Sequence, residues 1–120
     1  LTWALYGFST AYEYSRDPRF LETAEACADY YITHAPVDGV PPWDFKAPPE
    51  QQTQCDTSAA AIAAAGYLRL CRLIADPVKG HFYWSTAIRI LQSLCEKHLA
   101  VDDPGWDFFV EALENSMRRL

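Results

Sequence analysis

The chain has 120 residues, half of them hydrophobic and 14% aromatic, which is enough apolar material for one packed core but not for two. Its formal net charge is −6, and no Lys/Arg cluster is larger than Arg118-Arg119, so no nucleic-acid partner is expected. No apolar run reaches the roughly 18 to 20 residues that cross a bilayer, and no basic segment leads into an apolar one at the N-terminus. We therefore expect neither a membrane helix nor a signal peptide.

The first predicted elements form a helical hairpin over residues 1–34. Aromatic and aliphatic residues at three- and four-residue spacing predict one helix from Leu1 to about Ser15. Asp17-Pro18 ends this helix and begins the next, because Asp is a favourable N-cap and Pro is favoured at the first helical position. The same apolar spacing then continues to about residue 34.

The loop over residues 35–55 is long for a compact domain, in which connections above roughly 12 to 15 residues are uncommon and usually functional or disordered. Its five prolines restrict the backbone, and Trp43 and Phe45 flank Asp44. This composition argues against simple disorder. A large aromatic ring on such a loop is suited to stacking on a sugar or another planar ligand.

Three more helices are predicted after this loop, and no segment reads as a strand. Their ranges are from Asp56 or Thr57 to about Leu73, from about His81 to Lys97, and from about Trp106 to the end. The first of them is almost entirely alanine around Ile62, so it is narrow and apolar on every side. Such a helix is expected to be buried in an inner layer.

An internal repeat connects the two halves of the chain. Gly7 and Asp17-Pro18 recur as Gly66 and Asp76-Pro77 at a common offset of 59 positions. Tetratricopeptide repeats recur at about 34 residues and HEAT or armadillo repeats at about 40 to 47, so neither fits. The longer unit suits large helical hairpins that close into a double ring, and the predicted fold class is all-α.

Cys27, Cys55, Cys71 and Cys95 are widely spaced, with no C-x-x-C pair and only three histidines in the chain. This arrangement matches neither zinc nor iron–sulfur ligation, so no metal is expected. Ordinary reduced thiols favour a reducing compartment, and the localisation expected on this ground is cytoplasmic.

Asp56 is the central chemical question, because it stands where the Pro-rich loop becomes the alanine helix. A helix N-cap is one interpretation, and a general acid is the other. The two interpretations require opposite shifts in pKa. A capping position lowers the pKa of a carboxyl group, whereas proton donation near neutral pH requires a raised pKa. A catalyst here needs aromatic walls, which Trp43 and Phe45 can supply, and a second acid, which the sequence does not identify.

Four segments in register resemble the unsaturated glucuronyl hydrolases of glycoside hydrolase family 88. These segments are TWALYGF at 2–8, DPRFL at 17–21, DGVPPWDF at 38–45 and DTSAAAIAA at 56–64. The resemblance implies that residues 1–120 form a single partial (α/α)6 barrel domain of helical hairpins, with the loop 35–55 at its site. It also implies hydration of the C4–C5 double bond of an unsaturated uronic acid, without a cofactor, in oligosaccharides left by polysaccharide lyases.

The same resemblance implies roles for single residues. Asp56 matches the acid/base that protonates C4, while Trp43 resembles a pocket aromatic, and Asp44 and Trp3 are further candidates for binding the sugar. Asp44 also fits a simple turn carboxylate. Family members usually carry Arg where this chain has Cys55, and the family's second essential Asp lies upstream of the segment that resembles residues 2–8.

The match implies that the chain contains about five of the roughly twelve helices of the barrel. Three further expectations follow. Inner helices without neighbours expose apolar faces, so self-association is expected. The chain is expected to be an enzyme of this type, or a piece of one, acting on unsaturated glucuronyl or galacturonyl disaccharides, or on rhamnogalacturonan fragments. The alternatives are an inactive remnant of the hydrolase and a helical-repeat interaction module, in which the loop 35–55 should be mobile and dispensable.

Overall fold

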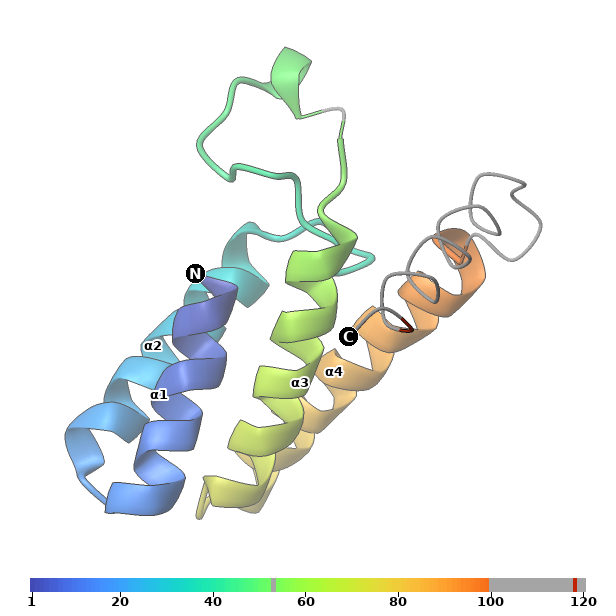
Figure 1. The fold of residues 1–120 in the computed structure, drawn as a ribbon. Coiled ribbons are helices and arrows are strands. Elements are labelled where there is room, and N and C mark those ends of the chain that lie inside the picture. Colours follow the sequence, from blue (N-terminus) through green and yellow to red (C-terminus); the bar gives the residue numbers. More distant parts are fainter. Residues whose placement is uncertain (53, 100–117, 119–120) are drawn as a thin grey trace.

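The described chain consists of helices joined by one tight turn at each hairpin and one long loop. The computed structural model describes residues 1–52, 54–99 and 118 (Figure 1). Its elements are α1 (Thr2–Ser15), α2 (Pro18–His34), the 3-10 turn η1 (Pro49–Gln51), α3 (Thr57–Leu73) and α4 (Pro77–Lys97). The predicted all-α fold is therefore confirmed. The fifth predicted helix, from about Trp106, lies outside the described residues.

The helices form two hairpins that stand side by side. In Figure 1, α1 and α3 lie next to each other and run in the same direction, while α2 and α4 return behind them. The most extensive contacts join α3 to α4, α3 to α1, and α1 to α2, whereas α2 and α3 touch much less. Both tight turns lie at one end of the molecule, and the long loop lies at the other (Figure 1).

An aspartate caps each of the described α-helices α2, α3 and α4. Asp17 accepts a hydrogen bond from the backbone N–H of Arg19, and Pro18 occupies the first helical position. Asp76 caps α4 in the same way, so α4 begins at Pro77, one turn before the predicted start at about His81. The prediction was wrong there because it did not apply the Asp-Pro signal a second time.

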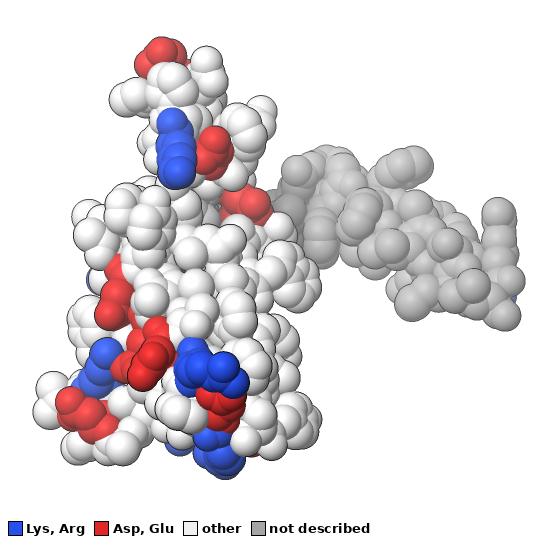
Figure 2. All heavy atoms as spheres, turned by 90° about the vertical axis from the view of Figure 1, so that its left-hand side faces the viewer, with Lys and Arg blue, Asp and Glu red and all other residues white. Residues whose placement is uncertain are grey.

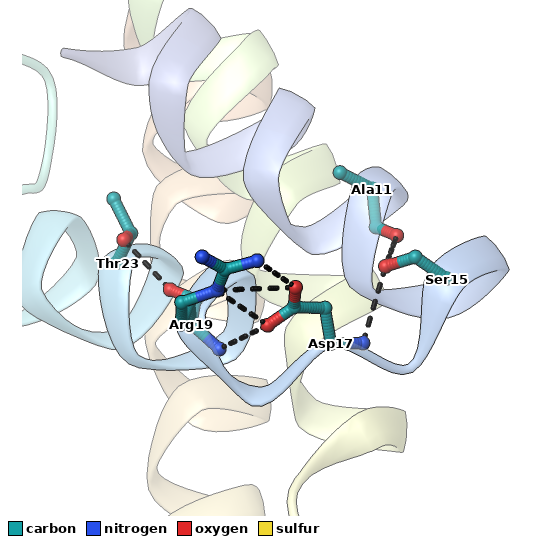
Figure 3. A network of polar contacts seen from close by, with 5 residues as sticks. All are labelled: Ala11, Ser15, Asp17, Arg19 and Thr23. Atoms are coloured by element: carbon teal, nitrogen blue, oxygen red, sulfur yellow. Dashed lines mark hydrogen bonds and ion pairs between the residues drawn. The ribbon is translucent and has the colours of Figure 1, made fainter.

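Local contacts close the turn between α1 and α2 (Figure 3). The guanidinium of Arg19 contacts both carboxylate oxygens of Asp17, at 2.6 to 3.1 Å, and this contact lowers the pKa of that carboxyl group to about 2. The Ser15 hydroxyl donates to the Ala11 carbonyl at 2.7 Å and accepts from the Asp17 N–H at 3.2 Å. These residues lie within one short stretch of sequence, so this end of the hairpin needs no distant partner.

Three buried tyrosines join the helices in the core. Tyr31, Tyr67 and Tyr83 come from α2, α3 and α4 and are at most 1% exposed. Their hydroxyls donate, respectively, to the Gly39 carbonyl at 2.6 Å, the Ala28 carbonyl at 2.6 Å and an Asp29 carboxylate oxygen at 2.8 Å. Burial raises the pKa of each phenol well above its ordinary value. Every hydroxyl is satisfied, which is the condition for placing Tyr in a core.

The inner helices α1 and α3 approach closely at Gly66. A Cβ at this position would lie 2.8 Å from Leu5 Cγ, so only glycine fits without displacing α1. Ala60, Ala63 and Ala64 are fully buried, but Ala61 and Ala65 are exposed. One apolar face of α3 is therefore exposed, as expected for an inner helix of a partial ring, because no described helix packs against it.

Candidate functional site

The long loop is fixed at its beginning by Gly39. This residue has φ 77°, a left-handed conformation that favours glycine, and a Cβ there would lie 2.6 Å from Ile90 Cγ1. Its carbonyl accepts the hydrogen bond from Tyr31, and Val40, which follows, is 1% exposed. The chain therefore leaves α2 along a path that the core itself determines.

Two backbone hydrogen bonds hold the arms of the loop together above α3. The N–H of Asp56 donates to the Pro41 carbonyl at 2.8 Å, and the N–H of Trp43 donates to the Gln54 carbonyl at 3.3 Å. These bonds flank an isolated antiparallel bridge between Pro42 and Cys55. They bring Trp43 and Asp56 together, although 12 residues separate the two in sequence.

A pocket of about 380 Å³ opens at this junction. Its lining includes Tyr30, Trp43, Asp44, Phe45, Lys46 and Asp56. Trp43 is 61% exposed, so most of its ring remains free to contact a ligand. Of the four candidate site residues, the structure thus brings Asp56, Trp43 and Asp44 together.

Asp56 caps α3, as one interpretation of the sequence required. One carboxylate oxygen accepts from the Ser58 hydroxyl at 2.6 Å and from the Ala59 N–H at 2.8 Å. The Ser58 contact first, and the Ala59 contact next, lower the pKa of Asp56 from its ordinary value. In this state the group is ionised at neutral pH, so it can accept a proton but must be protonated again before it donates one.

Asp44 is both a turn residue and a pocket residue. Its carboxylate accepts a hydrogen bond from the Lys46 N–H at 2.8 Å, and its carbonyl accepts one from the Ala47 N–H at 3.2 Å. It lines the same pocket as Asp56. The pocket therefore has a second carboxylate in its lining, which the sequence had not identified.

Tyr30 and Lys46 are pocket residues that the sequence analysis missed. The Tyr30 ring stacks on His34 at 3.8 Å between centroids and meets Phe45 edge-on at 6.3 Å. Tyr30 lies in the last full turn of α2, at the same end of the hairpin as the long loop. A search of helix ends for aromatic residues near the loop would have found it.

Trp3, the remaining candidate, lies elsewhere. It contributes to an apolar groove of about 350 Å³ between α1 and α3, together with Tyr6, Ala61, Ile62 and Ala65. It also contributes to a second opening along α1. Trp3 does not line the Asp56 pocket.

A larger opening of about 570 Å³ lies between the start of the loop and the end of α4. Its charged lining includes Asp38, Arg89, Glu96 and Lys97, and Lys97 Nζ lies 3.8 Å from an Asp38 carboxylate oxygen. It contains neither the helix-capping carboxylate nor an aromatic ring. Size alone therefore does not make it the better candidate, since recognition of a sugar requires convergent polar groups beside an apolar surface.

The described residues offer neither a metal site nor a membrane-spanning helix. Among residues 1–52, 54–99 and 118, no group of three or more His, Cys, Asp or Glu side chains is arranged to hold a metal ion. No helix in that part of the chain is long and apolar enough to cross a membrane. The four cysteines are all free thiols, two of them exposed.

Comparison with known proteins identifies unsaturated glucuronyl hydrolases among the relatives of this chain. No family model matches the chain. The chain is 41% identical over 70 residues to an unsaturated glucuronyl hydrolase of Formosa agariphila, a match that covers 57% of this chain and 18% of that protein. It is 37% identical over 82 residues to the unsaturated glucuronyl hydrolase of Bacillus sp. strain GL1, covering 67% and 22%. The chain thus spans about a fifth of the length of these relatives.

The comparison of structures agrees with the comparison of sequences. The crystal structure of the Bacillus sp. GL1 enzyme, described as responsible for the degradation of glycosaminoglycan, superposes with a TM-score of 0.78 at 32% identity. The superposition covers 85% of this chain and 27% of that one. The chain therefore matches part of the unsaturated glucuronyl hydrolases, and its helices match part of their (α/α)6 barrel. The predicted resemblance and fold are confirmed to this extent.

Proposed function

We propose that the pocket around Asp56 is part of a site that hydrates the C4–C5 double bond of an unsaturated uronic acid. The observation that supports this most directly is the meeting of Asp56 and Trp43 at the N-terminal end of an inner helix. An aromatic side chain can stack on one face of a sugar. A carboxyl group beside that side chain can then exchange a proton with a carbon atom of the sugar ring. The site needs no cofactor for this reaction.

The proposed reaction moves one proton and one water molecule. Asp56, in its protonated form, donates a proton to C4, and a water molecule adds to the cation at C5 while returning a proton to Asp56. The resulting hemiketal at C5 opens by breaking the bond between C5 and the ring oxygen, which gives a ketone at C5 and a hemiacetal at C1. Collapse of this hemiacetal breaks the bond between C1 and the glycosidic oxygen, so that C1 becomes an aldehyde and the remaining sugar leaves as an alcohol. Asp56 therefore acts first as the acid and then as the base.

The lowered pKa of Asp56 sets a condition on this scheme. Its hydrogen bonds with Ser58 and Ala59 favour the carboxylate, whereas the first step needs the acid. A sugar stacked on Trp43, which lines the same pocket, would exclude water from Asp56. Loss of water raises the pKa of a carboxyl group, which is the direction that proton donation requires.

The direct test is the ultraviolet absorbance of the conjugated uronate, which disappears on hydration. The substrates are lyase-generated disaccharides with an unsaturated glucuronyl or galacturonyl residue, and an unsaturated rhamnogalacturonan disaccharide. We expect absorbance to fall with the wild-type chain and to persist with Asp56→Asn, which keeps a side chain able to cap α3. Asp76→Asn, the same change at the cap of α4, is the matched control and should leave the rate unchanged.

Tryptophan fluorescence separates this proposal from its alternatives. A bound sugar should quench the fluorescence of the wild-type chain, and Trp43→Leu should abolish the quenching whereas Trp84→Leu should not. Binding without loss of absorbance would contradict catalysis and identify an inactive remnant of the hydrolase. Absence of both signals would favour the interaction module. That alternative requires a mobile loop, whereas hydrogen bonds at Gly39, Pro41 and Trp43 hold the loop in place.

A further inference from the structure

The chain has three lysines, and one of them lines the pocket described above. The other two are engaged elsewhere: Lys79 Nζ lies 2.6 Å from a Glu25 carboxylate oxygen, and Lys97 Nζ lies 3.8 Å from one of Asp38. Lys46, the lysine in the pocket, forms no ion pair within residues 1–52, 54–99 and 118. Its ammonium group is therefore available to an anion that enters from solution.

A short turn fixes the backbone of Lys46. Its N–H donates to an Asp44 carboxylate oxygen at 2.8 Å, and the next N–H, that of Ala47, donates to the Asp44 carbonyl at 3.2 Å. Ala47 is 8% exposed, and its carbonyl accepts from the Gln52 side chain at 2.6 Å. On the other side of Lys46, the Phe45 ring meets two tyrosines of α2 edge-on. The exposed lysine side chain therefore starts from a point that is held from both sides.

The charges that line the pocket do not neutralise one another. Its charged side chains are the carboxylates of Asp44 and Asp56 and the ammonium group of Lys46. Both carboxylates accept hydrogen bonds from neighbours in sequence, and the ammonium group pairs with neither. An anion that enters is repelled by the two carboxylates and attracted by Lys46. This lysine is thus the cation of the described lining that can make an anionic ligand acceptable.

Lys46 is also set apart from the other cations of the molecule. It is the only Lys or Arg between residues 35 and 55. In Figure 2 most charged side chains of the visible face gather toward the turn end, whereas the loop presents basic as well as acidic atoms at the other end. A positive charge therefore stands at the pocket and not in a general basic surface.

The ligand that the proposed function assigns to this pocket is itself an anion. An unsaturated uronic acid carries a carboxylate on C5, the ring atom bonded to C4. When C4 lies at Asp56, as protonation requires, this carboxylate lies in the same pocket. The glycosidic bond is at C1, on the opposite side of the ring from C4, so an anionic group on the second sugar lies further away. The C5 carboxylate is therefore the anion that Lys46 is placed to meet.

We propose that Lys46 determines the specificity of the pocket for an acidic sugar by forming an ion pair with the C5 carboxylate of the unsaturated uronate. The proposal rests on the ligand that the function proposed above assigns to the pocket. The carboxylate keeps its charge through the whole reaction, so the ion pair stabilises bound substrate and transition state alike. Such an interaction lowers KM and leaves kcat nearly unchanged. Lys46 is thus a binding residue, and Asp56 remains the group that exchanges protons.

The first test measures binding without turnover, in chains that carry Asp56→Asn. A lyase-generated disaccharide should quench the tryptophan fluorescence of this variant. Adding Lys46→Gln should raise the dissociation constant by about tenfold or more, as expected for loss of a charged hydrogen bond. Lys46→Arg, which keeps the charge, should restore most of the affinity. Arg89→Gln removes a positive charge from the larger opening beside α4 and is the matched control, with an expected change below about twofold.

The second test removes the charge from the sugar instead of from the protein. The methyl ester of the unsaturated uronate keeps the double bond but has no carboxylate, so Lys46→Gln should not change its dissociation constant. With the acid and wild-type Asp56, Lys46→Gln should raise KM in the absorbance assay by the same factor as the dissociation constant, and kcat should change by less than about threefold.

The outcomes separate this proposal from the proposed function. Equal affinity for the acid with and without Lys46, an equal loss for the methyl ester, or an equal effect of Arg89→Gln would each overturn the role of Lys46. Absorbance that persists with the wild-type chain, while binding of the acid still requires Lys46, would overturn the reaction and leave the ion pair supported. Absorbance that falls with an unchanged KM in Lys46→Gln would do the reverse. Absence of quenching by every disaccharide would overturn the ion pair.

Discussion

The two ends of the hairpins use the same capping residue for different purposes. At the turn end, Asp17 and Asp76 each precede a proline, and both of their carboxylates bond to backbone N–H groups of the first turn. At the loop end, Asp56 caps α3 in the same manner but also lines the pocket with Trp43. The comparison shows that the capping signal alone does not distinguish a structural aspartate from a candidate catalytic one. The path of the loop distinguishes them, because it brings Trp43 to the pocket that Asp56 lines.

Gly39 is the residue whose change should disturb the loop end most. Gly39→Ala places a side chain at φ 77° and 2.6 Å from Ile90 Cγ1, so the free energy of unfolding should fall by about 2–5 kcal/mol. Urea unfolding followed by circular dichroism measures the change. Gly7→Ala, studied at a concentration where the chain is monomeric, should instead be slightly stabilising. Similar values for both variants would show that the loop is not fixed at Gly39.

Tyr31 connects the core to the loop, and its hydroxyl should contribute measurably to this connection. Tyr31→Phe leaves the buried Gly39 carbonyl without its hydrogen bond and should lower the free energy of unfolding by about 1–3 kcal/mol. Tyr14→Phe, at a position that is 84% exposed, is the matched control and should change stability by less than about 0.5 kcal/mol. An equally small effect at Tyr31 would mean that the loop start is held by packing alone.

The cap at Asp56 should show a pH dependence of known sign. Asp56→Ala should lower the free energy of unfolding at neutral pH by about 0.5–2 kcal/mol. The folded pKa of Asp56 lies below the ordinary value of 3.8, so the charged cap stabilises the fold above that pH. Its contribution should be lost as the pH falls through the folded pKa. Urea unfolding of both proteins at neutral and acidic pH measures this, and a difference that stays constant on acidification would contradict it.

The smallest expected effect is at the turn end. Arg19→Ala removes the guanidinium that contacts Asp17, so the pKa of Asp17 should rise from about 2 toward its ordinary value of 3.8. Carboxyl carbon chemical shifts followed by NMR during an acid titration give this value directly. The helices should be unaffected, since the pair lies on the surface. An unchanged pKa would mean that the backbone N–H of Arg19, and not its side chain, dominates.

Much of the fold could be predicted because it depends on neighbours in sequence. Apolar spacing and the Asp17-Pro18 signal depend on residues within one or two helical turns, and α1, α2 and α3 begin and end close to their predicted positions. Asp56 was identified in the same way, since a cap and the helix after it are both local.

Only the tertiary structure decided what surrounds these elements. Tyr30 lines the pocket because the loop, which Tyr31 and the distant Ile90 hold at Gly39, returns to the end of α2. Trp3 instead lies in the groove between α1 and α3. Asp44 lines the same pocket as Asp56 through the same folding of the loop. The sequence by itself determined the helices and their caps, since both arise from local hydrogen bonding and spacing. The pocket and the open face of α1 depend on which distant side chains share a core, which local patterns do not specify.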